Sequence, residues 1–338
     1  MILFPDISPF DTGFHQTRDG QSLYWERCGK RGGVPIVFLH GGPGSGCTPA
    51  HRRFFDPIVF DIVLFDQRGC GRSTPLFALD GNNTQNQISD IEALRKQFGF
   101  ERWIVVGPSW GSTLALAYAE AHPESVSGLL VEGVFLASDV ELAWWHCRPG
   151  APNLFPDAFE NFIDQAKEPV RAGIRDFFLE NRDAMQIEIT GGMPVLHRMS
   201  DSGTTLTDLR QSLLYRWTEY EDRLSWLDAS PDHVRESLVA RGPEFVAAHS
   251  LLEAHYFAHG CFLKTDQLIQ DSQRLSGIPM EIIQSRYDAV CPPDAAYRLK
   301  EACPHARLTL INANGHAMTD AVYPTLIASL ARLADRAV

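Results

Sequence analysis

The sequence predicts an α/β fold in which a mostly parallel sheet is flanked by helices and carries an inserted helical cap. Two observations predict it. Short apolar runs typical of buried strands alternate with segments of helical periodicity along most of the 338 residues. The alternation stops between about residues 138 and 268, where helical spacing continues without further strands. We therefore divide the chain into an α/β core, residues 1–138 and 268–338, and a helical cap, residues 139–267.

Six apolar runs give the predicted strands of the core. Unbroken apolar runs indicate strands that are buried on both faces, as in a parallel sheet. They cover residues 34–40, 61–67, 102–107, 128–135, 280–285 and 307–312. The core helices that we expect cover residues 87–99, 112–122, 294–303 and 318–336. Because ligands of such sheets bind at the carboxyl ends of the strands, we expect the cap to roof a site there.

Composition and charge restrict the class of protein. With 44% hydrophobic and 21% charged residues, the chain has the composition of an ordinary globular protein. Its formal net charge of −12 argues against nucleic acid or an anionic membrane as a partner. We find no secretion signal and no membrane-spanning stretch, and expect a cytoplasmic location. The seven cysteines are scattered, which indicates free thiols, and Cys70 and Cys291 are expected to be packing residues.

The stretch Gly107-Pro108-Ser109-Trp110-Gly111 lies where a predicted strand becomes a predicted helix. It fits the pattern G-x-S-x-G, in which a sharp turn holds the serine hydroxyl out at the edge of the sheet. An ordinary serine N-cap is the simpler interpretation, but the strand-turn-helix context favours a nucleophile. The backbone N–H of Trp110 would then face a developing oxyanion.

A serine hydroxyl is a poor nucleophile unless a histidine removes its proton. After the cap, the chain has two histidines, His305 and His316. His305 precedes the last predicted strand and so lies at the wrong end of the sheet. His316 follows that strand, in a loop that can reach back over the sheet, and we predict it as the base for Ser109.

A carboxylate must orient the histidine, and in this arrangement it lies between the serine and the histidine in chain order. Asp288 lies just after the predicted strand 280–285, in a loop that ends in prolines. The alternatives Asp294 and Asp320 lie at helix starts, where an aspartate commonly caps the helix. We therefore predict a catalytic triad of Ser109, Asp288 and His316.

The second oxyanion donor is expected in the loop after the first core strand, which reads HGGPGSG over residues 40–46. Glycines let the backbone of this loop come close to a ligand. We assign the N–H of Gly42 as the donor, with that of Gly41 as the alternative. A glycine-rich loop can also cradle a phosphate, but this one matches neither of the common phosphate-binding patterns.

Several motifs occur in the order known from one family. The segments are HGGPGSG (40–46), FFDPIVFDIVLFDQRGCGRSTP (54–75), SWGSTLALAYAEAHP (109–123) and LFPDAFENF (154–162). They resemble the proline iminopeptidases, or prolyl aminopeptidases, which are serine peptidases of the α/β-hydrolase fold that remove an N-terminal proline. The resemblance runs from about residue 15 to 320, is strongest over 34–162, and implies the same triad.

The resemblance also implies substrate-binding residues in the cap, because the family holds the free amino terminus of its substrate with two cap glutamates. One belongs to a W-x-x-W-E pattern, which here reads Trp217-Thr218-Glu219-Tyr220-Glu221, and the other to E-x-H-Y-F, here Glu253 to Phe257. Glu221 and Glu253 are thus the implied ammonium ligands. The aromatic residues implied beside them are Trp217, Tyr220 and Tyr256. Carboxylates in a pocket of low dielectric suit a buried ammonium group.

Two positions depart from the family pattern. Pro108 stands before the serine where relatives usually have glycine, and Glu132 stands near the end of a strand where relatives usually have arginine. Both favour an alternative function, that of a carboxylesterase or amidase acting on uncharged acyl substrates. A hydrolase fold that only binds a partner is a third hypothesis, and the complete triad argues against it.

The main functional prediction is a serine exopeptidase that releases an N-terminal proline, or a similar small residue, through an acyl-enzyme. We expect no cofactor and no metal. His255 and His259 stand four residues apart on a predicted helix, but no third ligand accompanies them. The expected partner is a small peptide or amide with a free N-terminus, while the sequence leaves the oligomeric state open.

Overall fold

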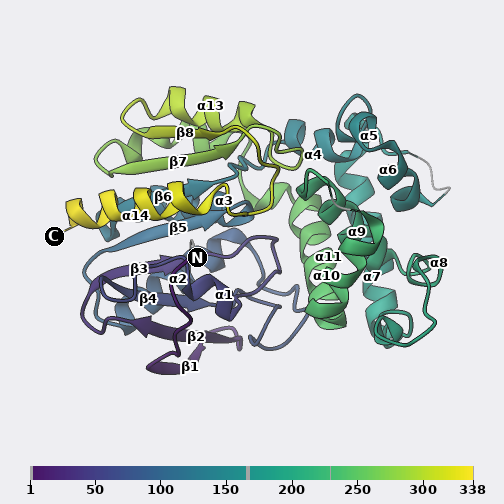
Figure 1. Cartoon of the computed structure of the whole chain (residues 1–338), viewed down its shortest axis with the longest axis horizontal. Helices are drawn as coiled ribbons and strands as arrows, with labels where there is room; N and C mark the ends of the chain where they lie inside the picture. The colour runs from purple at the N-terminus through teal and green to yellow at the C-terminus, as the bar shows by residue number, and fades with distance from the viewer. Residues whose placement is uncertain (1–2, 165–167, 229, 338) are drawn as a thin grey trace.

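An eight-stranded sheet with the order β1-β2-β4-β3-β5-β6-β7-β8 organises the molecule. The computed structural model describes residues 3–164, 168–228 and 230–337 (Figure 1). Helices cover both faces of the sheet, and a further group of helices gathers beyond one end of it. The predicted α/β fold with a mostly parallel sheet is confirmed.

All six predicted strands are present. They are β3 (Val34–Phe38), β4 (Phe60–Phe65), β5 (Trp103–Pro108), β6 (Val126–Glu132), β7 (Met280–Ser285) and β8 (Arg307–Ile311). Their pairings are parallel. Because helices cover both faces, β4 and β7 are buried along their whole length, which explains their apolar runs.

Two further strands, β1 (Asp11–Gln16) and β2 (Ser22–Gly29), join the sheet in antiparallel orientation and were not predicted. β1 lies at the edge of the sheet and is largely exposed. β2 carries Glu26, whose buried carboxylate accepts hydrogen bonds from Arg52 Nε and Nη2 at 2.6 and 2.9 Å. A charged residue that is buried through an ion pair interrupts the apolar pattern by which a strand is recognised.

The core helices follow the strands as expected. They are α1 (Pro49–Arg52), α2 (Thr84–Gln97), α3 (Trp110–Ala121), α13 (Pro293–Ala302) and α14 (Tyr323–Ala337), with the 3₁₀ turn η1 (Pro123–Ser125). α3 and α14 cover opposite faces of the sheet. Leu129 and Val131 of β6 pack in the cluster that contains α3, whereas Leu130 packs against α14. Alternation along the strand therefore directs Glu132 to the α14 side.

The segment between β6 and β7, which we call the insertion, contains helices and no strand among its described residues. The helices are α4 (Asp139–His146), α5 (Ala151–Leu154), α6 (Pro156–Ile163), α7 (Ile174–Thr190), α8 (Leu206–Leu209), α9 (Leu213–Ser225), α10 (Pro231–Arg241), α11 (Pro243–Ala258) and α12 (Gln267–Gln270). The 3₁₀ turns are η2 (Arg171–Gly173), η3 (Leu196–Arg198), η4 (Gly260–Phe262) and η5 (Ser272–Leu275). The cap boundaries at 139 and 267 stay a prediction, and residues 165–167 and 229 of that range lie outside the described residues.

The insertion has an aromatic interior. α11 packs against α7 and α9, and α6 packs against α9. Phe162 stacks on Tyr220 with 4.8 Å between ring centroids, and Trp217 is nearly fully buried beside them.

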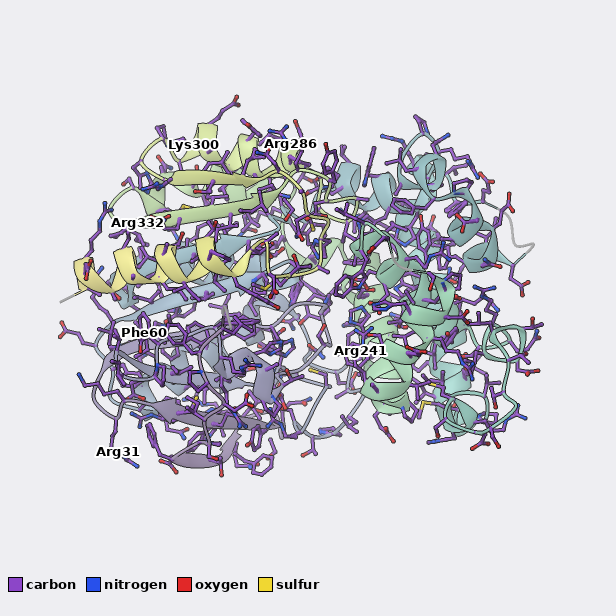
Figure 2. All side chains as sticks on the ribbon, in the orientation of Figure 1. Arg31, Phe60, Arg241, Arg286, Lys300 and Arg332 are labelled. Atoms are coloured by element: carbon purple, nitrogen blue, oxygen red, sulfur yellow. The ribbon has the colours of Figure 1, made fainter. Side chains whose placement is uncertain are left out.

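The surface of the core carries charged side chains, and the labelled Arg31 and Arg286 in Figure 2 lie at its exposed periphery. Among the described helices, none combines the length and the apolar character needed to cross a lipid bilayer.

Candidate active site

The turn after β5 holds Ser109 in an unusual backbone conformation, with φ of 55° and ψ of −127°. The N–H of Ser109 donates to the carbonyl of Glu132 at 2.8 Å, and α3 begins at the next residue. A Cβ on Gly107 would lie 2.0 Å from the carbonyl oxygen of Gly111, and one on Gly111 would lie 2.0 Å from that of Leu39. Strand, turn and helix approach so closely that glycine is required on both sides of the serine.

The three predicted triad residues come together at the carboxyl ends of β5, β7 and β8. His316 Nε2 lies 2.9 Å from Ser109 Oγ, and His316 Nδ1 lies 2.8 Å from Asp288 Oδ2. The alternative base, His305, precedes β8 and so lies at the opposite end of that strand. The hydrogen-bond chain from carboxylate to hydroxyl is the arrangement needed to turn a serine into a nucleophile.

Backbone groups hold the carboxylate of Asp288 in place. The N–H groups of Val290 and Cys291 donate to its Oδ1 at 2.9 and 2.7 Å. Gln284 Nε2 lies 3.4 Å from Oδ2, the oxygen that faces His316. These donors fix the orientation of the carboxylate and therefore the tautomer of the histidine, with the proton of Nδ1 facing Asp288.

Charge in the site favours a protonated His316. Burial alone would lower its pKa, but the neighbouring carboxylate of Asp288 outweighs burial, and Glu132 and Glu221 add to its effect, so the pKa is raised to about 9. Burial raises the pKa of Glu132 itself to about 8, with Asp288 adding to burial and His316 opposing it. Glu132 Oε1 is buried and has no hydrogen-bond partner among the described residues. Two titrating groups thus lie close together at the base of the site.

The loop over residues 40–46 runs beside the serine. A Cβ on Gly41 would lie 3.5 Å from Ser109 Cβ. Gly42 has a φ of +107°, and a Cβ there would lie 2.5 Å from the N of Gly44, so this position also requires glycine. Within the part of the chain that the structure describes, the N–H groups of Trp110, Gly42 and Gly41 have no hydrogen-bond partner. The choice between Gly42 and Gly41 as the oxyanion donor therefore stays a prediction.

Residues that follow β4 hold this loop. Asp66 Oδ1 accepts the N–H of Cys47 at 2.7 Å. Gln67 makes two hydrogen bonds to His40. The backbone N–H of Gln67 donates to His40 Nε2 at 3.0 Å, and Gln67 Nε2 donates to the backbone carbonyl of His40 at 2.9 Å. Trp110 Nε1 donates to Gln67 Oε1 at 2.9 Å. The glycine-rich loop, the β4 turn and the start of α3 are therefore one hydrogen-bonded unit around Ser109.

The two implied ammonium ligands meet inside the insertion. Glu221 comes from α9 and Glu253 from α11, and both are buried. Trp217 Nε1 donates to Glu253 Oε2 at 2.7 Å. Burial raises the pKa of Glu253 well above its usual range, and the carboxylate of Glu221 adds to this effect. The pair can therefore hold a proton or a cation between two carboxyl groups.

The sequence analysis did not single out His249, which lies between these glutamates. His249 Nε2 makes a hydrogen bond with Glu221 Oε2 and lies 3.7 Å from Glu253 Oε2. Burial alone would raise the pKa of Glu221, but His249 outweighs it, so this pKa is lowered. The i, i+4 spacing of His249 and Glu253 was a detectable signal, because it places both on one face of a helix.

The implied aromatic neighbours are buried, and two of them have hydrogen-bonded hydroxyl groups. Tyr220 Oη donates to the carbonyl of Trp145 at 2.6 Å, and Tyr256 Oη donates to Asn82 Oδ1 at 2.8 Å. The ring of Tyr256 packs edge-on against that of Trp110, with centroids 4.7 Å apart. Substrate contact by Trp217, Tyr220 and Tyr256 stays a prediction.

Other residues singled out in the sequence have internal partners. His255 Nε2 lies 2.9 Å from the carbonyl of Asn82, and His259 Nδ1 lies 2.7 Å from the carbonyl of His255. Cys70 and Cys291 are buried, and burial raises the pKa of both thiols well above the usual range. Protonated, buried thiols behave as small apolar residues.

The insertion is bonded to both loops that carry the base and the acid. Trp144 Nε1 on α4 donates to the carbonyl of Ala289 at 2.8 Å, next to Asp288. The N–H of Ala317, next to His316, donates to the carbonyl of Ser225 at the end of α9 at 2.9 Å. The insertion therefore contacts the site through main-chain positions adjacent to two triad residues.

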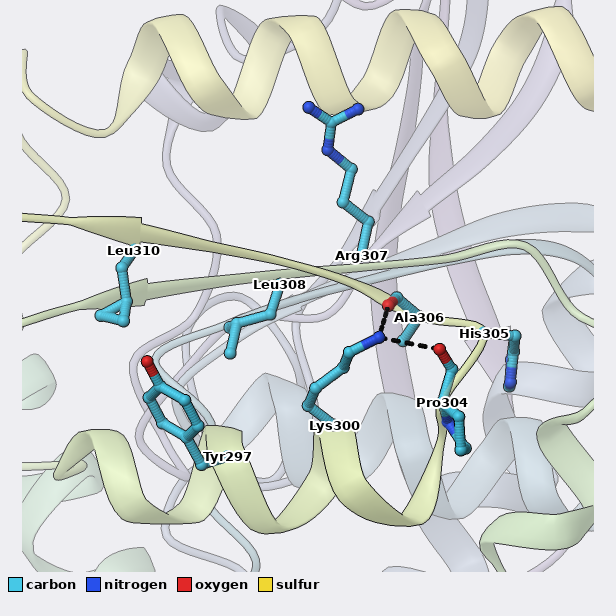
Figure 3. Close-up of a pocket in the computed structure, with 8 residues that line it drawn as sticks. All are labelled: Tyr297, Lys300, Pro304, His305, Ala306, Arg307, Leu308 and Leu310. Atoms are coloured by element: carbon cyan, nitrogen blue, oxygen red, sulfur yellow. Dashed lines mark hydrogen bonds between the residues drawn. The ribbon is translucent and has the colours of Figure 1, made fainter.

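A surface hollow of about 650 Å³ lies elsewhere, between α13 and the start of β8 (Figure 3). It is lined by Tyr297, Lys300, Pro304, His305, Ala306, Arg307, Leu308 and Leu310. The side chain of Lys300 extends into it, and its Nζ donates to the carbonyls of Pro304 and Ala306 at 2.8 and 2.6 Å. Because His316 follows the other end of β8, this hollow is separate from the candidate active site.

Known proteins point to one family. A family profile described as the alpha/beta hydrolase fold matches residues 34–319. A proline iminopeptidase of Xylella fastidiosa is 41% identical over 315 residues, which cover 93% of this chain and 93% of that protein. A proline iminopeptidase of Xanthomonas citri is 39% identical over 336 residues, 98% of each chain. The chain belongs to the proline iminopeptidase family.

Solved structures share the fold. A proline iminopeptidase of Mycobacterium smegmatis superposes with a TM-score of 0.56 at 18% identity, covering 97% of this chain and 98% of that one. An esterase of Exiguobacterium antarcticum has a TM-score of 0.63 at 16% identity, covering 96% and 100%. At these identities the likeness concerns the fold alone. Membership in the family identifies the chain as a hydrolase of the α/β-hydrolase fold.

The two positions that the sequence analysis interpreted as departures from the family pattern are neighbours in the sheet. Pro108 of β5 and Glu132 of β6 are register partners, and they immediately precede Ser109 and Gly133. Pro108 precedes Ser109, and a Cβ on Gly133 would lie 3.2 Å from His316 Cε1. Pro108 and Glu132 therefore lie side by side next to the predicted triad.

Proposed function

We propose that this chain is a serine exopeptidase that releases an N-terminal proline from small peptides through an acyl-enzyme. The observation that carries the proposal is the hydrogen-bond chain from Asp288 through His316 to Ser109. Family membership at about 40% identity supports the choice of substrate. The carboxylate of Glu221 acts on the pKa of His316, so the implied ammonium site and the triad lie within electrostatic reach.

In the first half of the reaction, Ser109 Oγ attacks the carbonyl carbon of the N-terminal proline, and its proton moves to His316 Nε2. Asp288 holds the opposite ring nitrogen and stabilises the resulting imidazolium. The oxyanion accepts hydrogen bonds from the N–H of Trp110 and that of Gly42. His316 then gives the proton to the leaving amine, the C–N bond breaks, and the shortened peptide departs.

In the second half, water replaces the leaving peptide. His316 takes a proton from the water as its oxygen attacks the ester carbonyl of the acyl-enzyme. The tetrahedral intermediate breaks the bond to Ser109 Oγ, which regains its proton from the histidine. The products are free proline and the enzyme in its starting state.

Glu221 and Glu253 set the requirement for a free amino terminus. Taking a charged ammonium out of water costs several kcal/mol, about the amount that a paired carboxylate must return. Two buried carboxyl groups on neighbouring helices supply that pairing, whereas an ester or a blocked peptide brings no charge to them. A substrate with a blocked amine is therefore expected to bind poorly.

The test compares proline naphthylamide with its N-acetylated form on purified protein. Ser109→Ala is expected to lose turnover of proline naphthylamide while keeping its fold by circular dichroism. Glu253→Gln is expected to raise KM at least tenfold with a smaller effect on kcat, because it removes ammonium binding. Glu236→Gln, on the exposed face of α10, is the matched control and should behave as wild type.

One observation favours a second candidate, a carboxylesterase or amidase for uncharged acyl compounds. His249 already forms a hydrogen bond with Glu221 Oε2, so one carboxylate oxygen that an ammonium group needs is already engaged. This candidate predicts that nitrophenyl acetate is hydrolysed faster than proline nitroanilide. Equal turnover of free and N-acetylated proline naphthylamide would reject the exopeptidase and favour this alternative.

A further inference from the structure

Three side chains from two helices of the insertion converge on one point. Glu221 comes from α9, while His249 and Glu253 stand one turn apart on α11 and so share a face. One ligand atom from each residue lies within 4.8 Å of the others, and all three residues are buried. Among the described residues, this is the one group of three with the spacing of a metal site.

The surroundings prepare these groups for a cation. Ser45 Oγ lies 3.2 Å from His249 Nδ1 and can accept a proton from it, and in that tautomer the lone pair of Nε2 is directed toward the glutamates. Trp217 Nε1 donates to Glu253 Oε2 and orients that carboxylate. The ring of Phe245 stacks on that of His249 at 5.4 Å, which fixes the imidazole plane. Metal ligands are usually oriented by such neighbours.

A buried carboxylate oxygen is left over at the same place. Glu253 is fully buried, and its Oε1 has no hydrogen-bond partner in the part of the chain that the structure describes. An ion pair between His249 and Glu221 alone does not satisfy this oxygen. Buried oxygens without partners are rare because their desolvation is not repaid, so this one indicates a missing cation or donor.

The donor set selects the kind of cation. One imidazole nitrogen with two carboxylates and an open position is a zinc-type site, with bonds of about 2.0–2.2 Å. Tetrahedral angles with such bonds separate neighbouring ligand atoms by about 3.4 Å. His249 Nε2 lies 3.7 Å from Glu253 Oε2, whereas its hydrogen bond to Glu221 Oε2 is shorter than this spacing, so zinc must replace that hydrogen bond and move the two atoms apart. Mg²⁺ and Ca²⁺ prefer more oxygen ligands and no imidazole.

We propose that Glu221, His249 and Glu253 bind one Zn²⁺ ion, and that the bound ion occupies the place of the substrate ammonium. The binding of zinc stands independently of the exopeptidase activity. Its consequence, inhibition of turnover, rests on the proposed function. The serine mechanism itself needs no metal, so zinc acts here as an inhibitor that competes with the cationic end of the substrate.

Binding is tested first, without any substrate. Calorimetric titration of the full chain with zinc chloride is expected to give one site per chain, and Co²⁺ in its place should give the visible absorption of a four-coordinate ion. His249→Gln and Glu253→Gln, each shown to be folded by circular dichroism, should bind at least tenfold more weakly and lose the cobalt spectrum. His305→Gln, at the far hollow of Figure 3, is the control for surface histidines and should bind as wild type.

Inhibition is tested second, with proline naphthylamide. Zinc is expected to raise KM without lowering kcat, and His249→Gln should need at least tenfold more zinc for the same effect. Unchanged zinc affinity in both His249→Gln and Glu253→Gln would overturn the site, whatever the activity. Zinc binding that is lost in these variants but lowers kcat alone in wild type would keep the metal site and overturn the shared position with the ammonium.

Discussion

Replacing Ser109 with glycine and with alanine separates the chemistry of the serine from the strain in its backbone. Both variants lack the hydroxyl group, and both are expected to lose turnover. They differ at φ of 55° and ψ of −127°, a conformation that costs a residue with a Cβ about 1–3 kcal/mol. Glycine adopts it freely, although glycine also makes the unfolded chain more flexible, at a cost of about 1 kcal/mol relative to alanine. We expect Ser109→Gly to be about 0–2 kcal/mol more stable than Ser109→Ala.

An unstrained serine supplies the reference. Ser89 lies exposed within α2, where the backbone is helical, and its hydroxyl bond to the carbonyl of Gln85 is lost in both variants. There glycine should be about 1 kcal/mol less stable than alanine. When the stability difference between glycine and alanine at position 89 is subtracted from that at position 109, the contribution of unfolded-chain flexibility cancels. The remaining difference, about 1–3 kcal/mol, is the strain that the fold maintains at Ser109.

The assay is urea unfolding followed by tryptophan fluorescence, with the four variants measured side by side. The free energy of unfolding is taken only from transitions whose urea dependence matches that of wild type. If glycine is less stable than alanine by the same amount at both positions, then Ser109 carries no strain and the reasoning fails. A strained serine would mean that the fold sacrifices stability to expose the nucleophile.

Two further predictions concern the neighbours of His316. Glu132→Gln removes a carboxylate that helps to raise the pKa of His316 to about 9. His316 must be neutral to act as a base, so kcat/KM rises with pH as His316 loses its proton. In the variant this rise should move to lower pH, and an unchanged pH profile would contradict the effect of Glu132 on the pKa of His316. Gly133→Ala forces a Cβ to 3.2 Å from His316 Cε1 at a φ of +56° and should lower kcat about 10- to 100-fold. Gly203→Ala has a φ of +99° with open space around the new Cβ, so it should lose stability and keep kcat, and equal kcat in both variants would refute the contact.

The strands of the fold differed in how well they could be predicted. β4 and β7 are covered on both faces, and consecutive apolar residues, Ile62–Phe65 and Ile282–Ile283, made them recognisable although each strand also carries a buried charged residue, Asp61 or Glu281. β1 is an exposed edge, and β2 carries Glu26, which is buried with Arg52 of α1 and Arg72 as its ion-pair partners. The pair with Arg52 joins residues 26 positions apart, and a local pattern does not contain it.

The residues of the site also differed in whether a local sequence pattern could reveal them. Ser109 was recognisable because the close approach of strand and helix dictates its flanking glycines, a local requirement. His316 and Asp288 followed from chain order along the sheet. His249 was missed because its significance depends on Glu221, which belongs to another helix. The i, i+4 spacing within α11 shows that His249 shares a face with Glu253, but it does not show that Glu221 meets them there.

The bonds between the insertion and the triad loops limit how a substrate can enter. A hinge motion that lifted the insertion away as one body would break the bond from Trp144 to Ala289 and the bond from Ala317 to Ser225. It would thereby pull on the loops that carry Asp288 and His316 just when the substrate arrives. Rigid-body opening of the insertion and an assembled triad therefore exclude one another, so the triad stays assembled only while the insertion remains in place.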